Sequence, residues 1–150
     1  MTTIAFDGKT MAADKQSVGG GRKYQRLTSK IRRGLYHGMP ALFSGAGTIV
    51  YVDAMIDWFI AGMPDDKPEM PEGPDSFTVL VATEVGLYEY IDSLRPIALG
   101  PTKWAIGSGA EYALGAMAAG ASAKRAVEIA CTLDVNSGMG VDTLTLRKAK

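Results

Sequence analysis

Thr2 is the residue whose position suggests chemistry, because it directly follows Met1. Removal of Met1 would leave Thr2 with its hydroxyl and the free α-amine of the chain on one residue. An N-terminal amine has a pKa of about 7.7 to 8.0, so part of it is unprotonated near neutral pH. Such an amine can act as general base for the hydroxyl of its own residue, which makes the threonine a nucleophile. Because many proteins begin Met-Thr, the rest of the chain has to support this hypothesis.

Four further positions could complete a site around Thr2: Asp14, Lys30, Gly45 and Gly47. A buried lysine near the amine would keep that amine unprotonated by like-charge repulsion, and it would need a carboxylate partner such as Asp14. Backbone N–H groups of the two glycines, which precede an expected helix, could stabilise an oxyanion. Taken singly, each position also has an ordinary structural interpretation: a strand end, a basic surface run with its neighbours, and turn glycines.

The N-terminal segments must hold these residues in place. Residues 2–6 and 10–14 predict a β-hairpin closed by Asp7-Gly8, which would fix the N-terminus inside a sheet. Gly19-Gly20-Gly21 predicts a flexible loop, and it lacks the Gly-Lys-Ser/Thr ending of a phosphate-binding loop. Residues 27–33 predict a short basic strand.

The middle of the chain predicts a strand at 41–44 and a helix at 48–61, with Thr48 as N-cap and Gly62 as stop. The apolar residues of this helix share one face: Val52, Met55, Ile56, Phe59 and Ile60. Residues 63–75 hold four of the seven prolines and predict an irregular acidic loop.

The C-terminal half predicts three strands, two helices and a last strand, at 77–83, 86–92, 103–106, 110–119, 123–133 and 141–146. Gly120 ends the first of these helices and Ser122 caps the second. This order of elements, in one domain spanning 1–150, predicts an α+β fold with helices packed on the outer faces of sheets.

Composition limits the possible classes of function. The 150 residues are 47% apolar and 21% charged, as in ordinary globular proteins. Because 16 basic residues balance 16 acidic ones, no net charge favours nucleic acid or a membrane surface. No stretch approaches the ~20 apolar residues that span a bilayer, and no secretion signal is visible, so we expect a cytoplasmic protein. Cys131 is expected to be a small core residue, since the only histidine, His37, lies in a turn.

Six motifs in order carry a resemblance to a known family. They are Thr-Thr-Ile at 2–4, Ala-Ala-Asp at 12–14, Lys-Ile-Arg-Arg at 30–33, Phe-Ser-Gly-Ala-Gly at 43–47, Ala-Ile-Gly-Ser-Gly at 105–109 and Leu-Asp-Val-Asn-Ser-Gly at 133–138. On these motifs the chain resembles the proteasome β-subunit and HslV peptidases, which are N-terminal-threonine (Ntn) hydrolases, and most of all their short phage and prophage forms. The resemblance implies a four-layer αββα sandwich with a reduced helical layer.

The resemblance also implies a role for each matching position. Thr2 matches the nucleophile, Asp14 and Lys30 match the groups that set the charge of the site, and Gly45 matches the oxyanion-hole glycine. Ser108 matches a serine that hydrogen-bonds near the threonine amine, and Asp134 and Ser137 match the residues that complete that network. Without the resemblance, Ser108 is equally well a helix N-cap, and the last two are turn residues.

The implied activity is a threonine peptidase that cleaves polypeptides inside a homo-oligomeric ring, with a double hexamer as the inherited arrangement. No metal is expected for the chemistry, although the resemblance allows a structural monovalent cation near 134–142. The sequence has no ATP-binding motif, so an ATP-dependent unfoldase would be a separate partner. No nucleic-acid or membrane partner is expected.

One departure from the family leaves alternatives open. Larger relatives place a second long helix where this chain has the proline-rich residues 63–75, and that helix contributes to subunit contacts. Ring formation is therefore an open question. The alternatives to a peptidase are a catalytically silent ring-forming scaffold on the same fold and an amidase acting on a small molecule.

Overall fold

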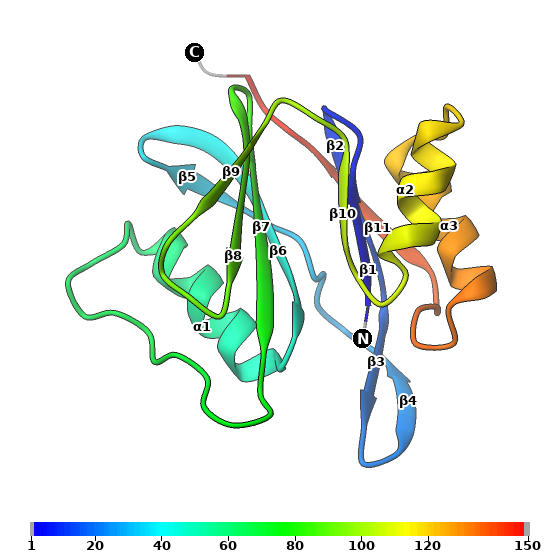
Figure 1. Cartoon of the computed structure of the whole chain (residues 1–150), viewed down its shortest axis with the longest axis horizontal. Helices are drawn as coiled ribbons and strands as arrows, with labels where there is room; N and C mark the ends of the chain where they lie inside the picture. The colour runs from blue at the N-terminus through cyan, green and yellow to red at the C-terminus, as the bar shows by residue number, and fades with distance from the viewer. Residues whose placement is uncertain (1, 149–150) are drawn as a thin grey trace.

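Two antiparallel sheets form the centre of the computed structural model, which describes residues 2–148 (Figure 1). The first sheet has the order β10-β1-β2-β11, with β1 (Thr3–Phe6), β2 (Thr10–Asp14), β10 (Trp104–Gly107) and β11 (Val141–Thr145). The second has the order β5-β6-β7-β8-β9, with β5 (Arg32–Tyr36), β6 (Met39–Gly47), β7 (Phe77–Thr83), β8 (Gly86–Ile91) and β9 (Ile97–Gly100).

Helices cover the outer face of each sheet. Helix α1 (Ile49–Ile60) packs on the five-stranded sheet, and α2 (Ala110–Ala118) and α3 (Ala123–Leu133) pack on the four-stranded sheet (Figure 1). The predicted four-layer αββα sandwich is confirmed. Its reduced helical layer is the α1 side, where one helix stands instead of two.

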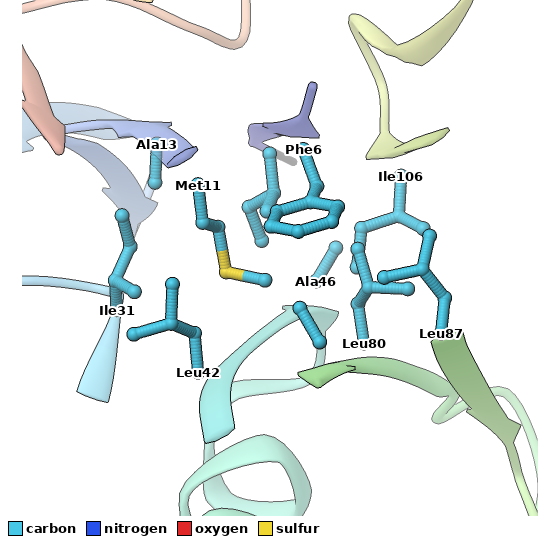
Figure 2. Packing of buried hydrophobic residues seen from close by; sticks show 11 residues of the cluster. Phe6, Met11, Ala13, Ile31, Leu42, Ala46, Leu80, Leu87 and Ile106 are labelled. Atoms are coloured by element: carbon cyan, nitrogen blue, oxygen red, sulfur yellow. The ribbon is translucent and has the colours of Figure 1, made fainter. Parts of the chain in front are cut away.

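The strands alternate their side chains between the inner and outer layers, as the pleat of a sheet requires. Ile4 and Phe6 of β1 meet Leu42 of β6 and Leu80 of β7 between the two sheets, where Figure 2 shows their cluster. Phe43, the next residue along β6, points the other way and packs under α1. The central strands of the two sheets are therefore buried on both faces.

The helix faces agree with the predicted pattern with one exception. Val52, Met55, Ile56 and Phe59 of α1 are buried, but Ile60 is exposed at the last turn of the helix. On the other side, α3 is capped by Ser122, whose side chain accepts the Arg125 N–H at 3.2 Å as predicted. Small residues on α2 and α3 let α2 lie close against β1 and β10, and α3 close against β1 and β2.

The N-terminal hairpin is confirmed, with Ile4 opposite Ala13 and Phe6 opposite Met11. Two predictions nearby are wrong. Gly19-Gly20-Gly21 is not a free loop, because it lies at the turn of a second hairpin, β3 (Gln16–Gly19) and β4 (Arg22–Gln25). The basic strand expected at 27–33 begins only at Arg32, because residues 27–31 have no strand partner.

The proline-rich segment has no regular structure, as predicted, and it is tied to α1. The Trp58 Nε1–H donates to the Pro64 carbonyl at 2.9 Å, and Met70 packs against the cluster under the helix. A strand that the sequence analysis missed, β9, pairs with β8 across an irregular register. Among the described residues, no helix has the length and apolarity needed to cross a membrane.

Candidate active site

Thr2 lies just before β1, buried beside Asp14 at the end of β2 and Lys30 in the segment ahead of β5. The Thr2 hydroxyl donates to Asp14 Oδ1, and it accepts a hydrogen bond from Lys30 Nζ at 2.5 Å. Lys30 Nζ also lies 2.9 Å from Asp14 Oδ1. The first three predicted site residues therefore form one buried cluster around a single hydroxyl.

Lys30 uses its whole hydrogen-bonding capacity in this cluster. An ammonium has three N–H donors. Those of Lys30 reach Thr2 Oγ1, Asp14 Oδ1 and the Gln16 carbonyl, the last at 2.5 Å. Its own carbonyl accepts the Ser44 hydroxyl at 2.7 Å, which anchors the segment to β6. The lysine is therefore fixed at both its backbone and its charged end.

Asp14 is held by backbone N–H groups as well as by these side chains. Its Oδ1 accepts the Thr3 N–H at 3.0 Å, and its Oδ2 accepts those of Gly138 at 3.0 Å and Gln16 at 3.3 Å. These hydrogen bonds engage both carboxylate oxygens and fix the orientation of the side chain. Asp14 therefore compensates the Lys30 charge at a site where both side chains are buried.

Burial lowers the pKa of Lys30 below its ordinary value. The nearby Asp14 carboxylate acts in the opposite direction, and the positive charge of Arg26 adds to the lowering. An ammonium in this position repels a second positive charge, so it would also disfavour protonation of an α-amine on Thr2.

A second polar network lies on the main-chain side of Thr2. Ser108 Oγ lies 2.6 Å from Asp134 Oδ2 and 3.3 Å from the Thr2 carbonyl oxygen. Ser137 Oγ donates to the same carboxylate oxygen at 2.6 Å. Because its hydrogen is used there, Ser137 Oγ accepts a hydrogen bond from the Thr3 hydroxyl at 2.7 Å. Through these two serines, the Asp134 carboxylate at the end of α3 is linked to Thr2 and Thr3.

These hydrogen bonds determine the charge of Asp134. Burial acts to raise the pKa of its carboxyl, but the donors Ser108 and Ser137 and the Asn136 N–H outweigh this effect, and the pKa lies below its ordinary value. Asp134 is therefore a carboxylate at neutral pH. Ser108 does not cap α2, because the N-cap position belongs to Gly109.

Two glycines flanking Ser108 allow the backbone to approach Thr2 and Thr3. Gly107 has φ +95°, and a Cβ there would overlap the Thr2 carbonyl oxygen. A Cβ on Gly109 would overlap Thr3 Oγ1. The motif Gly-Ser-Gly at 107–109 therefore brings a serine to the main chain of Thr2 where no bulkier sequence would fit.

Gly45 lies on β6 at the wall of a cavity that opens at Thr2. The cavity has a volume of about 460 Å³ and is lined by residues of β3, β4, β6 and α1 as well as by Thr2 and Lys30. Because β5 pairs with β6 only as far as Phe43, the end of β6 has no strand neighbour on that edge within residues 2–148. A Cβ on Gly45 would lie 2.6 Å from Val52 Cγ1, so only glycine fits against α1 here.

Two other predictions concern thiol and metal chemistry. Burial raises the pKa of the Cys131 thiol to about 11, so this cysteine is a neutral thiol at physiological pH. Within residues 2–148, no group of three or more His, Cys, Asp or Glu side chains is placed to hold a metal ion. The monovalent cation suggested near 134–142 stays a prediction.

Solved structures share this arrangement of layers. BPH of Thiobacillus denitrificans is 22% identical to this chain, with a TM-score of 0.71 over 99% of this chain and 98% of the other. The same protein in complex with epoxomicin gives a TM-score of 0.72 at 22% identity, covering 99% of both chains. HslV of Trypanosoma brucei is 20% identical, with a TM-score of 0.66 over 96% of this chain and 97% of the other.

This chain has the HslV fold. The match runs through almost the whole length of each protein, so it includes both sheets and both helical layers. No model of a protein family and no curated protein matches the sequence. The HslV fold is thus evident from the structure, while the identity of 20–22% leaves the activity to be argued from the site.

All seven predicted site residues lie in or beside the two networks and the cavity. Sequence reasoning missed Thr3, whose hydroxyl links β1 to Ser137, and Gln16, whose carbonyl accepts from Lys30. The signal for Thr3 was present, because a polar residue inside an otherwise apolar strand calls for a buried partner. Met1, whose removal the prediction requires, lies outside the described residues.

Proposed function

We propose that the chain is a threonine peptidase whose nucleophile is Thr2 after removal of Met1. One observation carries the proposal: the Thr2 hydroxyl bonds to a buried Lys30–Asp14 pair at the edge of a 460 Å³ cavity. Buried ion pairs cost free energy to desolvate, so one placed on a threonine hydroxyl needs a reason beyond stability. Control of the charge and orientation of a nucleophile is such a reason.

The proposed reaction has two steps. The Thr2 hydroxyl attacks a peptide carbonyl, and the free α-amine of Thr2 takes the hydroxyl proton directly or through a water. The oxyanion is stabilised by the Gly45 N–H, a type of donor worth about 3–4 kcal/mol. The amine then passes the proton to the leaving nitrogen, the C–N bond breaks, and water hydrolyses the ester on Thr2. None of these steps calls on a metal.

The two networks have different roles in this mechanism. Lys30 favours the unprotonated amine, and Asp14 compensates the lysine charge. Ser108, Asp134 and Ser137 position the main chain of Thr2, because they bond to its carbonyl and to the neighbouring Thr3 hydroxyl. The same fold in a Thiobacillus denitrificans protein has been solved with epoxomicin, which makes epoxomicin a suitable probe of this cavity.

The decisive experiment combines intact mass with peptide hydrolysis. We expect purified protein to lack the mass of Met1 and to hydrolyse fluorogenic peptides, with Thr2→Ser retaining part of the activity and Thr2→Ala retaining none above background. Protein with an N-terminal tag that leaves residues before Thr2 should be inactive, whereas a C-terminal tag should be tolerated. Equal turnover by Thr2→Ala would mean that the nucleophile is another residue.

Retention of Met1 in an inactive protein would favour the silent scaffold instead. We further propose a homo-oligomer, with polypeptide substrates supplied by a separate ATP-dependent unfoldase, on the strength of the HslV fold. Light scattering of the purified protein measures the oligomeric state. A closed ring would indicate proteolysis in a chamber, and a monomer would contradict that part of the proposal.

A further inference from the structure

The cavity at Thr2 contains one positive charge that the proposed mechanism does not use. Among the residues that line it, the charged ones are Lys30 and Arg26, and no aspartate or glutamate is among them. Lys30 has no donor left for a substrate, since its three N–H groups reach Thr2, Asp14 and Gln16. A ligand in the cavity that needs a cationic partner can therefore find it only at Arg26.

Arg26 is held at its backbone and free at its charged end. Its N–H donates to the Lys15 carbonyl at 2.8 Å, which fixes the chain between β4 and β5. Arg26 as a residue is half-buried, and among residues 2–148 its guanidinium makes no hydrogen bond or ion pair. A guanidinium offers five donors in a planar fork that matches a carboxylate, so this side chain is available for a ligand of that chemistry.

A second cavity, of about 360 Å³, shares Arg26, Lys30, Gly45 and Val52 with the first. Two carboxylates line it: Asp57 pairs with Arg32 at 2.5 Å, and Asp53 forms no ion pair among the described residues. The larger cavity has no such counter-charge. In the cavity at Thr2, the positive charge of Arg26 therefore has no acidic residue beside it in the lining.

We propose that Arg26 determines specificity, by binding a carboxylate of the substrate close to the bond that Thr2 cleaves. The inference rests on the proposed peptidase function. The carboxylate belongs either to an acidic side chain or to the C-terminus of a peptide. Both present the same two oxygens to the guanidinium, and they are separated by the choice of peptides.

The test uses internally quenched peptide amides that carry Glu at one position at a time, each matched with its Gln version. Charge-assisted hydrogen bonds at a partly exposed site predict a kcat/KM about tenfold higher for the best Glu peptide. Arg26→Gln should abolish this preference, and Arg26→Glu should turn it into a preference for Lys at the same position. Lys23→Gln, which removes an exposed positive charge on β4 outside both cavities, should leave it unchanged. The Gln peptide with a free C-terminus, compared with its amide, tests the second source of the carboxylate.

The outcomes separate this inference from the peptidase proposal, because dissociation constants of the same peptides are measured by fluorescence anisotropy. Cleavage without discrimination between Glu, Gln and the free acid, or discrimination that survives Arg26→Gln, would overturn the role of Arg26 alone. Charge-selective binding that depends on Arg26, with no cleavage by protein lacking Met1, would overturn the peptidase and leave the carboxylate site standing. Absence of both would overturn both.

Discussion

The two polar networks at Thr2 differ in charge and in the part of the residue that they contact. The Asp14–Lys30 network reaches the side chain and consists of a fully buried ion pair. The Ser108–Asp134–Ser137 network reaches the main chain and consists of hydroxyl donors around one carboxylate. The first can change the reactivity of the hydroxyl, whereas the second can only hold the residue in place. Substitutions in the first should therefore reduce turnover more than substitutions in the second.

The largest effect is expected from breaking the ion pair, and it should be asymmetric. Asp14→Asn leaves the Lys30 ammonium buried without a counter-charge and should lower the free energy of unfolding by about 3–5 kcal/mol. Lys30→Met leaves Asp14 with the Thr2 hydroxyl and three backbone N–H donors. The free energy of unfolding should therefore fall by only about 1–3 kcal/mol, the cost of leaving one buried hydrogen bond unmade. Urea unfolding measures both losses.

Turnover should respond to both variants of the pair in the same way. Each should lower kcat by at least about 100-fold, the usual scale of a group that governs a proton transfer. Equal destabilisation by Asp14→Asn and Lys30→Met would show that the backbone donors do not compensate the carboxylate. Normal turnover in Lys30→Met would contradict the assignment of reactivity to this network.

The second network is best tested by comparing its two serines. Ser108→Ala and Ser137→Ala each remove one hydrogen bond to a charged carboxylate, so each should cost about 1.5–3 kcal/mol of stability. Only Ser108 contacts Thr2 itself, so only Ser108→Ala should also lower kcat, and by less than the substitutions in the ion pair do. Similar turnover in the two alanine variants would show that contact with the Thr2 carbonyl has no role in positioning.

Most elements of the fold could be predicted from strong local signals in the sequence, whereas the αββα sandwich and the roles of Ser108, Asp134 and Ser137 were predicted only from the resemblance to HslV peptidases. The Asp7-Gly8 turn between apolar runs predicts the first hairpin, and the short, mostly apolar run at 77–83 predicts β7. The second hairpin was missed because β3 and β4 are short and mostly polar and every residue of β4 is exposed, so no periodicity marks them. The start of β5 was misplaced because its position depends on pairing with β6, which no local pattern reveals.

The roles of the glycines at 107 and 109 were missed for a similar reason. These glycines let their segment approach Thr2 and Thr3, which lie more than a hundred residues away in the sequence. The sequence around them shows only a glycine-rich start of a helix. Gly109→Ala should cost about 1–3 kcal/mol, because its Cβ would overlap Thr3 Oγ1 and press on Ala130. Gly115→Ala is the matched control: it lies in α2 with open space around a new Cβ, so it should stabilise the helix by about 0.5–1 kcal/mol. Thermal unfolding of both variants distinguishes close approach from a general need for glycine.

The smallest effect concerns pH and involves only the second network. The pKa of Asp134 lies below its unfolded value, so its hydrogen bonds contribute stability that is fully present above that unfolded value of about 3.9 and is lost as pH falls through the folded value. Ser137→Ala removes one of the donors that lower this pKa, so the fall in stability on acidification should become shallower below about pH 4 than in the wild type. Unfolding measured between neutral and acidic pH gives the two curves. Parallel curves would mean that Asp134 keeps its low pKa through Ser108 and the Asn136 N–H alone, and that the link to Thr3 adds rigidity without changing the charge of the network.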